Sequence, residues 1–285
     1  MKVLVATDGS KYGKWAIEWL SRIPFVTRPT VRVVHAMDVG ALRAPFMVQP
    51  VIVGSERYIQ AEVKRMEAAA RSAKKEATAL LASLGFGGTV TIDRGAVGPT
   101  IVKHCKRGIG LLAMGSRGLD ALDRFMLGSV STYAIHHAGC SVLLVKEAPK
   151  AVSQIMLAVD GSSASDKAVR FLLRNLNPQP NGPDKEPIDV VVVHVMPFLK
   201  YPEVREAGRA VVRRYADQIA KAGFQIQEAP RLGKPADEIL TVAKQYKADL
   251  IVTGAKGLGA IGRALLGSVS TRVMQHSSCS VLVVR

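Results

Sequence analysis

Short apolar, β-branched stretches alternate with amphipathic stretches along the whole chain. Lys2–Thr7 and Thr30–Met37 have the composition of strands, and the valines of the second suit burial on both faces of a sheet. Apolar residues in Trp15–Leu20 mark a helix, and Glu56–Leu84 is rich in Ala, Lys and Glu, which favour a long helix. Strands that alternate with helices predict a parallel sheet with helices on both of its faces.

The rest of the first half continues this alternation. Gly85 is expected to end the long helix, and Pro99 lies in the first turn of an expected helix, where proline is tolerated. The remaining expected elements are strands at Thr89–Arg94, Leu111–Met114 and Cys140–Val145 and helices at Pro99–Cys105 and Val130–His137. Sheets of this kind bind ligands outside the carboxyl ends of their strands.

The second half of the chain repeats the first. Leu111–Val145 lies over Leu250–Val284 without a gap, and about half of the paired residues are identical, including the run LGSVST. The beginnings match as well, because Val3–Leu20 resembles Ile155–Leu172. Two copies of this length indicate a duplicated domain rather than a solenoid. We therefore predict an α/β protein of two tandem doubly wound, Rossmann-like domains, 1–147 and 153–285, packed as a pseudo-dimer.

Composition and charge narrow the class of protein. Of 285 residues, 48% are hydrophobic and 22% are charged, which is an ordinary globular composition, and no apolar run is long enough to cross a bilayer. The N-terminal stretch lacks the features of a signal peptide and the three cysteines form no disulfide framework, so we expect a cytoplasmic protein. The net charge of +16 favours anionic partners, but with only 5% aromatic residues we do not expect nucleic acid.

Glycines gather where the expected strands end. The first strand of each copy ends in Asp-Gly-Ser, at Asp8 and Asp160, and the fourth strand leads into the spacing Gly-x2-Gly-x9-Gly-Ser. The last glycine of this motif precedes a helix, whose free amide groups and dipole favour an anion, and Ser131 and Ser270 can add hydroxyl donors. The motif comprises Gly115, Gly118, Gly128 and Ser129 in the first copy and Gly254, Gly257, Gly267 and Ser268 in the second.

These motifs resemble those of the universal stress protein family, and in particular its members with two domains in one chain. The resemblance covers Val3–Val145 and Ile155–Val284 and includes the strand-end aspartate, the glycine motif and the closing strand that begins Cys-Ser-Val-Leu. It implies an adenine nucleotide alpha hydrolase-like fold. In members that bind ATP, the glycine motif holds the phosphates and ribose, and the aspartate lies beside the nucleotide and its metal ion.

By this resemblance, the glycine motif, Asp8 and Asp160 bind ATP, and the backbone of Ala36 in the first copy and of Val195 in the second meets adenine. We expect ATP or another adenine nucleotide as the ligand, with Mg²⁺ near the two aspartates and no metal site made by protein alone. The motifs form a phosphate cradle without an evident base. The family therefore implies a regulator of the stress response with little or no turnover and a protein partner that is unknown.

Other interpretations of the same residues stay open. The glycines can serve only tight turns and packing, and the aspartates can cap helices. Arg124 and Arg263 can reach phosphate or remain in solvent, while Arg117 and Lys256 fit solvated loops. A slow adenine-nucleotide hydrolase or transferase and a basic nucleic-acid-associated protein are the alternative functions. The matching histidines His35, His194, His137 and His276 are interpreted as residues of packing or local hydrogen bonding, and the matching Cys140 and Cys279 as buried strand thiols.

Two expectations concern assembly and stoichiometry. The closing strands Cys140–Val145 and Cys279–Val284 are apolar, and in the family that this chain resembles such strands pair two domains. By this resemblance we expect them to pair within the chain and cover each other's edges, which leaves a homodimer of two chains open. Both copies contain the whole motif, so we expect two nucleotides per chain. Ser116 of the first copy is replaced by Ala255 in the second, which predicts tighter binding in the first copy.

Overall fold

The first half of the chain folds as an alternation of strands and helices, close to the one expected. The computed structural model describes residues 1–43, 55–106, 108–118, 127–180, 182, 186–196, 202–257 and 266–285. The short helix α2 was not predicted. The elements are β1 (Lys2–Ala6), α1 (Lys11–Arg22), β2 (Thr30–Met37), α2 (Val39–Arg43), α3 (Ser55–Ser83), β3 (Gly88–Arg94), α4 (Val97–Cys105), β4 (Leu111–Gly115), α5 (Ser129–His137) and β5 (Ser141–Val145).

The second half repeats this order, with a single helix between its second and third strands in the residues that the structure describes. That helix is shorter than α3 and also ends before a glycine, Gly223, with a positive φ of 95°. The elements are β6 (Gln154–Ala158), α6 (Ser163–Asn175), β7 (Asp189–Met196), α7 (Pro202–Ala220), β8 (Gln225–Leu232), α8 (Pro235–Gln245), β9 (Leu250–Gly254), α9 (Ser268–His276) and β10 (Ser280–Val284).

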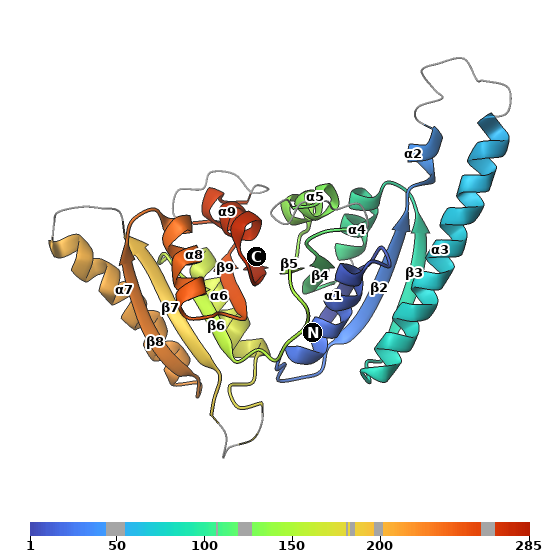
Figure 1. The fold of residues 1–285 in the computed structure, drawn as a ribbon. Helices are drawn as coiled ribbons and strands as arrows, with labels where there is room; N and C mark the ends of the chain where they lie inside the picture. The colour runs from blue at the N-terminus through green and yellow to red at the C-terminus, as the bar shows by residue number, and fades with distance from the viewer. Residues whose placement is uncertain are drawn as a thin grey trace.

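One sheet of ten strands passes through both halves of the described chain (Figure 1). Its order is β3-β2-β1-β4-β5-β10-β9-β6-β7-β8, so the two halves meet at β5 and β10. Each half is parallel throughout, and only the central pair of strands is antiparallel. The predicted α/β fold of two tandem Rossmann-like domains is thereby confirmed. We call the two halves domain 1 and domain 2.

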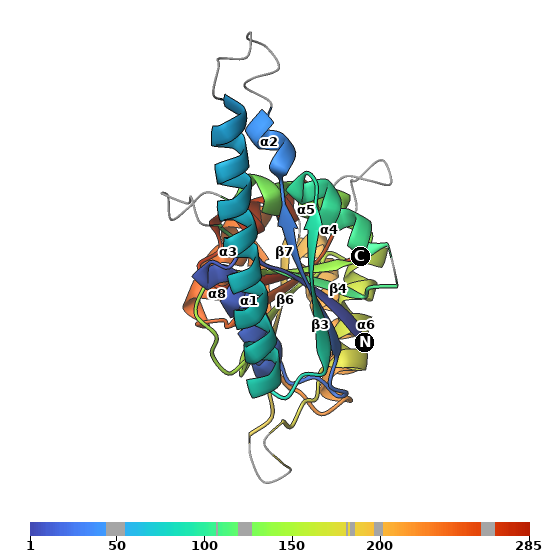
Figure 2. The same cartoon turned by 90° about the vertical axis from the view of Figure 1, so that its right-hand side faces the viewer.

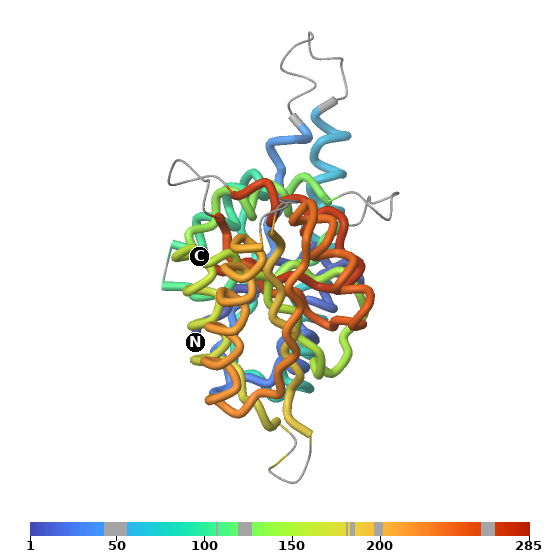
Figure 3. Tube along the Cα trace, turned by 90° about the vertical axis from the view of Figure 1, so that its left-hand side faces the viewer, coloured from blue at the N-terminus to red at the C-terminus, as the bar shows by residue number. Residues whose placement is uncertain are grey.

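Two apolar cores cover the two faces of this sheet. One core packs α1, α3, α6 and α7 against the sheet and contains the fully buried Trp19 and Tyr215. The other packs α4, α5, α8 and α9 on the opposite face. Figure 2 and Figure 3 show that the N-terminal end of α3 projects beyond the sheet and the other helices of the two domains, apart from α2 beside it. None of the described helices is long and apolar enough to cross a membrane.

The long helix α3 ends where the sequence predicts. Gly85 has a φ of 68°, in the left-handed region that favours glycine. The amide of Gly85 donates to the carbonyl of Ala82 at 2.9 Å, and the amide of Phe86 donates to the carbonyl of Leu81 at 2.9 Å. These two bonds form a Schellman motif, which satisfies the last carbonyls of the helix. Phe86 is buried in the core beneath it.

The closing strands of the two domains pair as predicted. Val142 lies opposite Val283, and Leu143 lies opposite Leu282, in an antiparallel ladder whose residues are all buried. Because the pairing is made inside one chain, each domain covers the sheet edge that the other would expose. The predicted internal pseudo-dimer is therefore confirmed for the closing strands.

Contacts around this ladder are repeated with the domains exchanged. The ammonium of Lys146, just after β5, donates to the carbonyls of Gln275 and Ser277 at the end of α9, at 3.1 and 2.7 Å. The guanidinium of Arg285, just after β10, donates to the carbonyl of Ile135 in α5. Each domain thus supplies a cation to the carbonyl end of the other domain's last helix, where the helix dipole favours positive charge.

Candidate functional site

The aspartates at the ends of β1 and β6 shape the turns that lead into α1 and α6. Asp8 Oδ1 accepts from the amide of Ser10 at 2.9 Å, and Asp160 Oδ1 accepts from the amide of Ser162 at 3.0 Å. The helix caps are the serines themselves: Ser10 Oγ accepts from the amide of Gly13, and Ser162 Oγ accepts from the amide of Ser165. The alternative that the aspartates cap these helices is therefore wrong.

The second glycine of each motif lies against the aspartate. A Cβ atom placed on Gly118 would lie 2.7 Å from Asp8 Oδ2, and one placed on Gly257 would lie 2.5 Å from Asp160 Oδ2. A larger residue would have to displace the carboxylate, so glycine lets the loop approach the aspartate closely. The structure thus brings the ends of the first and fourth strands together in each domain, as the sequence predicts.

The first glycine of each motif is explained by packing. A Cβ atom on Gly115 would lie 2.6 Å from Cβ of Tyr12 in α1, and one on Gly254 would lie 2.7 Å from Cβ of Ala164 in α6. Close helix–sheet contact is therefore sufficient reason for these two glycines, and they say nothing about a ligand.

The third glycine of each motif has no such structural reason. Gly128 and Gly267 have φ values of −61° and −69°, which any residue adopts, and among the described residues an added Cβ atom would meet nothing closer than 3.5 Å. Both are the N-cap residues of their helices, a position that favours Ser, Thr, Asp or Asn. Within the part of the chain that the structure describes, no side chain makes a cap hydrogen bond to α5 or α9. These glycines leave the first amides of both helices open to an anion.

The serines of the motif differ in what they offer. Ser129 and Ser268 are exposed at the helix starts. Ser131 and Ser270 are buried, and their hydroxyls donate to the carbonyls of Gly115 at 2.9 Å and of Ala255 at 3.1 Å, so they hold the loop to the strand end. Ser116, the expected extra donor of domain 1, is only 2% exposed and its Oγ has no partner among the described residues. Its hydroxyl is closed off from solvent.

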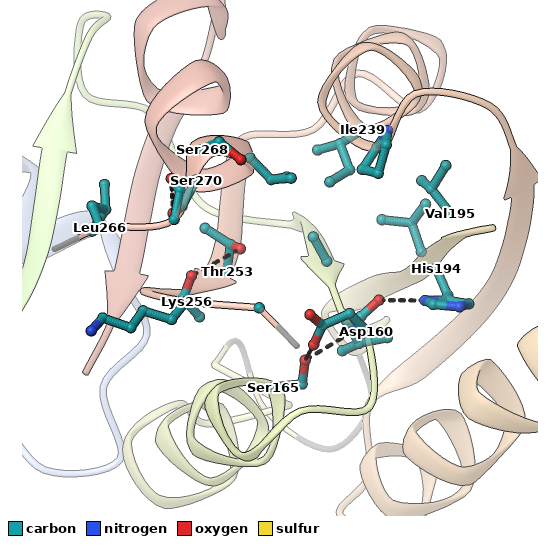
Figure 4. Close-up of a pocket in the computed structure, with 18 residues that line it drawn as sticks. Asp160, Ser165, His194, Val195, Ile239, Thr253, Lys256, Leu266, Ser268 and Ser270 are labelled. Carbon is teal, nitrogen blue, oxygen red and sulfur yellow. Dashed lines mark hydrogen bonds between the residues drawn. The ribbon is translucent and has the colours of Figure 1, made fainter. Parts of the chain in front are cut away.

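In domain 2 these elements enclose a cavity of about 470 Å³, within the range of small-molecule sites. The ends of β6, β7 and β9 form its floor, and α8 and the start of α9 form its walls. Figure 4 shows a division along the cavity: Val195 and Ile239 lie at one end, and Ser268 and Ser270 lie at the other. Asp160 lies between them (Figure 4). One end is therefore apolar, and the other presents the uncapped amides of α9.

The cavity includes polar residues that the motif alone does not indicate. His194 Nδ1 lies 2.8 Å from the carbonyl of Val159, and the hydroxyl of Ser165 donates to Asp160 Oδ1 at 2.7 Å. The bond to Val159 agrees with the local hydrogen bonding that the sequence leaves open for His194, but the motif does not indicate that His194 lines a cavity. Lys256, interpreted as a solvated loop residue, lines the cavity as well. Arg124 and Arg263 lie outside the described residues.

In domain 1 the residues that match those of the domain 2 cavity have different neighbours. Ala36 is half-buried in β2, opposite Asp93 of β3. Burial lowers the pKa of the neighbouring His35, against the opposing effect of the Asp8 carboxylate. Arg117, the counterpart of Lys256, donates from Nη1 to the hydroxyl of Tyr12 at 2.8 Å.

The described residues hold no cluster of three or more His, Cys, Asp or Glu side chains that could bind a metal ion by themselves. Among the described residues that line the cavity of domain 2, Asp160 is the one carboxylate. Mg²⁺ is commonly held by one or two carboxylates together with substrate phosphates, so this donor set fits an ion that arrives with a nucleotide. All three cysteines are buried and unpaired in disulfides.

Comparison with known proteins agrees with the duplication. The family model described as the universal stress protein family matches residues 1–146 and again 152–285. A universal stress protein of Mycolicibacterium smegmatis is 28% identical over 99% of this chain and 96% of its own length. One from Methanocaldococcus jannaschii is 30% identical over 50% of this chain and 87% of its own length.

A solved structure shares the whole fold. The crystal structure of a universal stress protein from Archaeoglobus fulgidus covers 100% of this chain and 96% of its own, with a TM-score of 0.72 and 20% identity. Full-length matches in sequence and in fold confirm the resemblance, including the tandem arrangement. The chain therefore belongs to the universal stress protein family and contains two copies of its domain.

Proposed function

We propose that this chain is a regulator of the stress response that binds adenine nucleotides, ATP foremost, and acts through a protein partner with little or no turnover. The observation that carries the proposal is the pair of uncapped helices behind Gly128 and Gly267, where glycine has no packing or conformational cause. A helix start kept open in this way suits a phosphate group, because its amides and dipole attract an anion.

The division of the domain 2 cavity supports a nucleotide rather than a simple anion. An adenine ring suits the apolar end, against Val195 and Ile239, while the phosphates suit the amides of α9. Asp160 lies between the two ends (Figure 4), where ribose and a phosphate-bound Mg²⁺ would lie. Mg²⁺ bound with the nucleotide would neutralise phosphate charge, and Asp160 is the carboxylate among the described lining residues that would hold it.

The absence of turnover is proposed from the placement of the cavity's titratable groups. His194 lies at the end opposite the α9 amides in Figure 4, so it is poorly placed to activate water at a terminal phosphate. The hydroxyl of Ser165 is engaged with Asp160 on both sides, since it donates to Oδ1 and accepts from the Asp160 amide at 2.9 Å. It is thus unsuited to act as a nucleophile.

The decisive experiment replaces each third glycine by aspartate. Gly128→Asp and Gly267→Asp supply a favourable N-cap and place a negative charge where phosphate would bind. Titration calorimetry should find two ATP sites in the unchanged protein and one in each variant, with melting temperatures unchanged or higher. Gly139→Asp is the matched control, because a Cβ atom there meets nothing within 4 Å and the position is exposed.

Full ATP binding by both variants would contradict the proposal. Turnover is checked by phosphate release from ATP with Mg²⁺ over hours. Several turnovers per minute by the purified protein would favour the hydrolase alternative instead.

A further inference from the structure

The two domains place a cation at the same point of the glycine motif but with different freedom. Lys256 follows Gly254 in domain 2 and lines the cavity. No hydrogen bond or ion pair joins its ammonium to the described residues, and its long side chain lies beside the loop, away from Asp160, in Figure 4. A flexible ammonium of this kind can reorient toward a bound anion at little cost.

In domain 1 the equivalent cation is held by an aromatic side chain. The guanidinium of Arg117 donates to the Tyr12 hydroxyl at 2.8 Å and lies 5.3 Å from the centre of the Tyr12 ring. Tyr12 is itself fixed, because its Cβ packs on Gly115 and its ring meets Trp15 edge-to-face at 5.1 Å. Arg117 would lose both the hydrogen bond and the cation–π contact if its guanidinium moved toward a bound phosphate.

Domain 2 lacks this restraint for a single reason. The residue that packs on Gly254 at the position of Tyr12 is Ala164, which has neither a ring nor a hydroxyl. The presence of Tyr12 or Ala164 therefore decides whether the motif cation is tethered to the first helix.

We propose that Lys256 is the phosphate-binding cation of domain 2 and that Tyr12 withdraws Arg117 from this task in domain 1. Domain 2 is then the tighter site for nucleotides with a phosphate chain, and the two sites differ little for the nucleoside alone. This inference rests on the proposed function. It reverses the order of affinity expected from Ser116, whose hydroxyl is enclosed.

The test uses two probes, ATP and adenosine, in variants that confine ATP binding to one domain. In the Gly128→Asp background, where ATP binds in domain 2 alone, Lys256→Gln should weaken ATP about tenfold, as expected for one charge-assisted hydrogen bond, and should leave the affinity for adenosine, which lacks phosphate, within twofold. In the Gly267→Asp background, where ATP binds in domain 1 alone, Arg117→Gln should change ATP binding less than about threefold. A role of Lys256 in folding alone would affect both probes equally.

A reciprocal exchange keeps the inference testable if one variant folds poorly. Tyr12→Ala with Arg117→Lys gives domain 1 the residues of domain 2 and should tighten ATP there several-fold. Ala164→Tyr with Lys256→Arg should weaken ATP in domain 2 to a similar extent. Circular dichroism and melting temperature confirm that each protein is folded.

The outcomes separate this inference from the proposal on which it rests. Failure of the unchanged protein to bind either probe removes both. Normal ATP binding that is insensitive to Lys256→Gln, or a loss shared equally by adenosine, overturns the role of Lys256 alone. Unchanged ATP affinities after the exchange of Tyr12 and Ala164 would overturn the proposal that Tyr12 restrains Arg117.

Discussion

The turn between the first strand and first helix holds a hydroxyl in both domains, but a different residue supplies it. In domain 2 the hydroxyl comes from the helix, where Ser165 bonds to the Asp160 carboxylate and amide. In domain 1 it comes from the residue just after β1: Thr7 Oγ1 accepts from the amide of Gly9 at 3.2 Å, and a Cβ atom on Gly13 would overlap it. Thr7 and Gly13 of domain 1 thus stand at the positions that Val159 and Ser165 occupy in domain 2.

This comparison teaches that the duplicated sites have diverged in pairs of contacting residues. The aspartate and the three glycines are shared, while the residues that support them have been exchanged together. A second such exchange concerns the motif cation and its neighbour. Domain 1 has Tyr12 and Arg117 where domain 2 has Ala164 and Lys256. A change of one member alone should therefore be harmful or should alter binding, while a change of both should move one domain toward the other.

The largest effect is expected where the two domains are joined. Val142→Pro removes an amide from β5, which lies between β4 and β10, and introduces a ring into a fully buried ladder. We expect loss of cooperative folding and aggregation, measured by light scattering and by the soluble fraction after expression. Val142→Ala, which removes apolar volume but not the amide, should stay soluble and lose only about 1–3 kcal/mol of unfolding free energy. A soluble, cooperatively folding proline variant would show that the shared sheet does not depend on this pairing.

An intermediate effect is expected at the exchanged pair. Gly13→Ser in domain 1 forces a side chain onto Thr7 and should lower the unfolding free energy by about 1–3 kcal/mol, as for other overpacked sites. Adding Thr7→Val reproduces the pair of domain 2 and should recover most of the loss. Urea unfolding of the two single variants and the double variant measures this coupling. Simple additivity of the two changes would contradict paired divergence.

The smallest effect concerns the cations that clamp the domains together. Burial lowers the pKa of Lys146 to about 8. In the unfolded chain the ammonium keeps its proton up to about 10.4, so between these values the unfolded state binds more protons and the unfolding free energy rises with pH. Lys146→Arg, which copies Arg285, stays charged and should lack this rise.

The comparison is made by denaturant unfolding at pH 7 and pH 9.5. The unchanged protein should gain on the order of 1 kcal/mol relative to Lys146→Arg. The exposed Lys221→Arg is the matched control and should follow the unchanged protein. Parallel pH curves for the unchanged protein and Lys146→Arg would mean that the ammonium of Lys146 is not affected by its burial.

Sequence alone determined the duplication, the order of strands and helices and the residues that converge at the strand ends. These follow from local causes: periodicity of apolar residues, glycine at Gly85 where φ is positive, and parallel strands whose ends meet at one edge. The pairing of β5 with β10 was predicted from the family resemblance, and it agrees with the apolar composition of the two closing strands, whose edges need cover.

Only the tertiary structure decided what each motif residue does. In the sequence the three glycines of the motif are equivalent, but Gly254 packs tightly on Ala164, Gly257 lies against the Asp160 carboxylate, and a Cβ atom on Gly267 would meet no described atom closer than 3.5 Å. Likewise the sequence shows Arg117 and Lys256 only as matching cations, while the structure shows that Tyr12 holds Arg117. The physical reason is that these roles depend on contacts between residues about 100 positions apart, which are set by packing across the sheet and have no counterpart in local sequence.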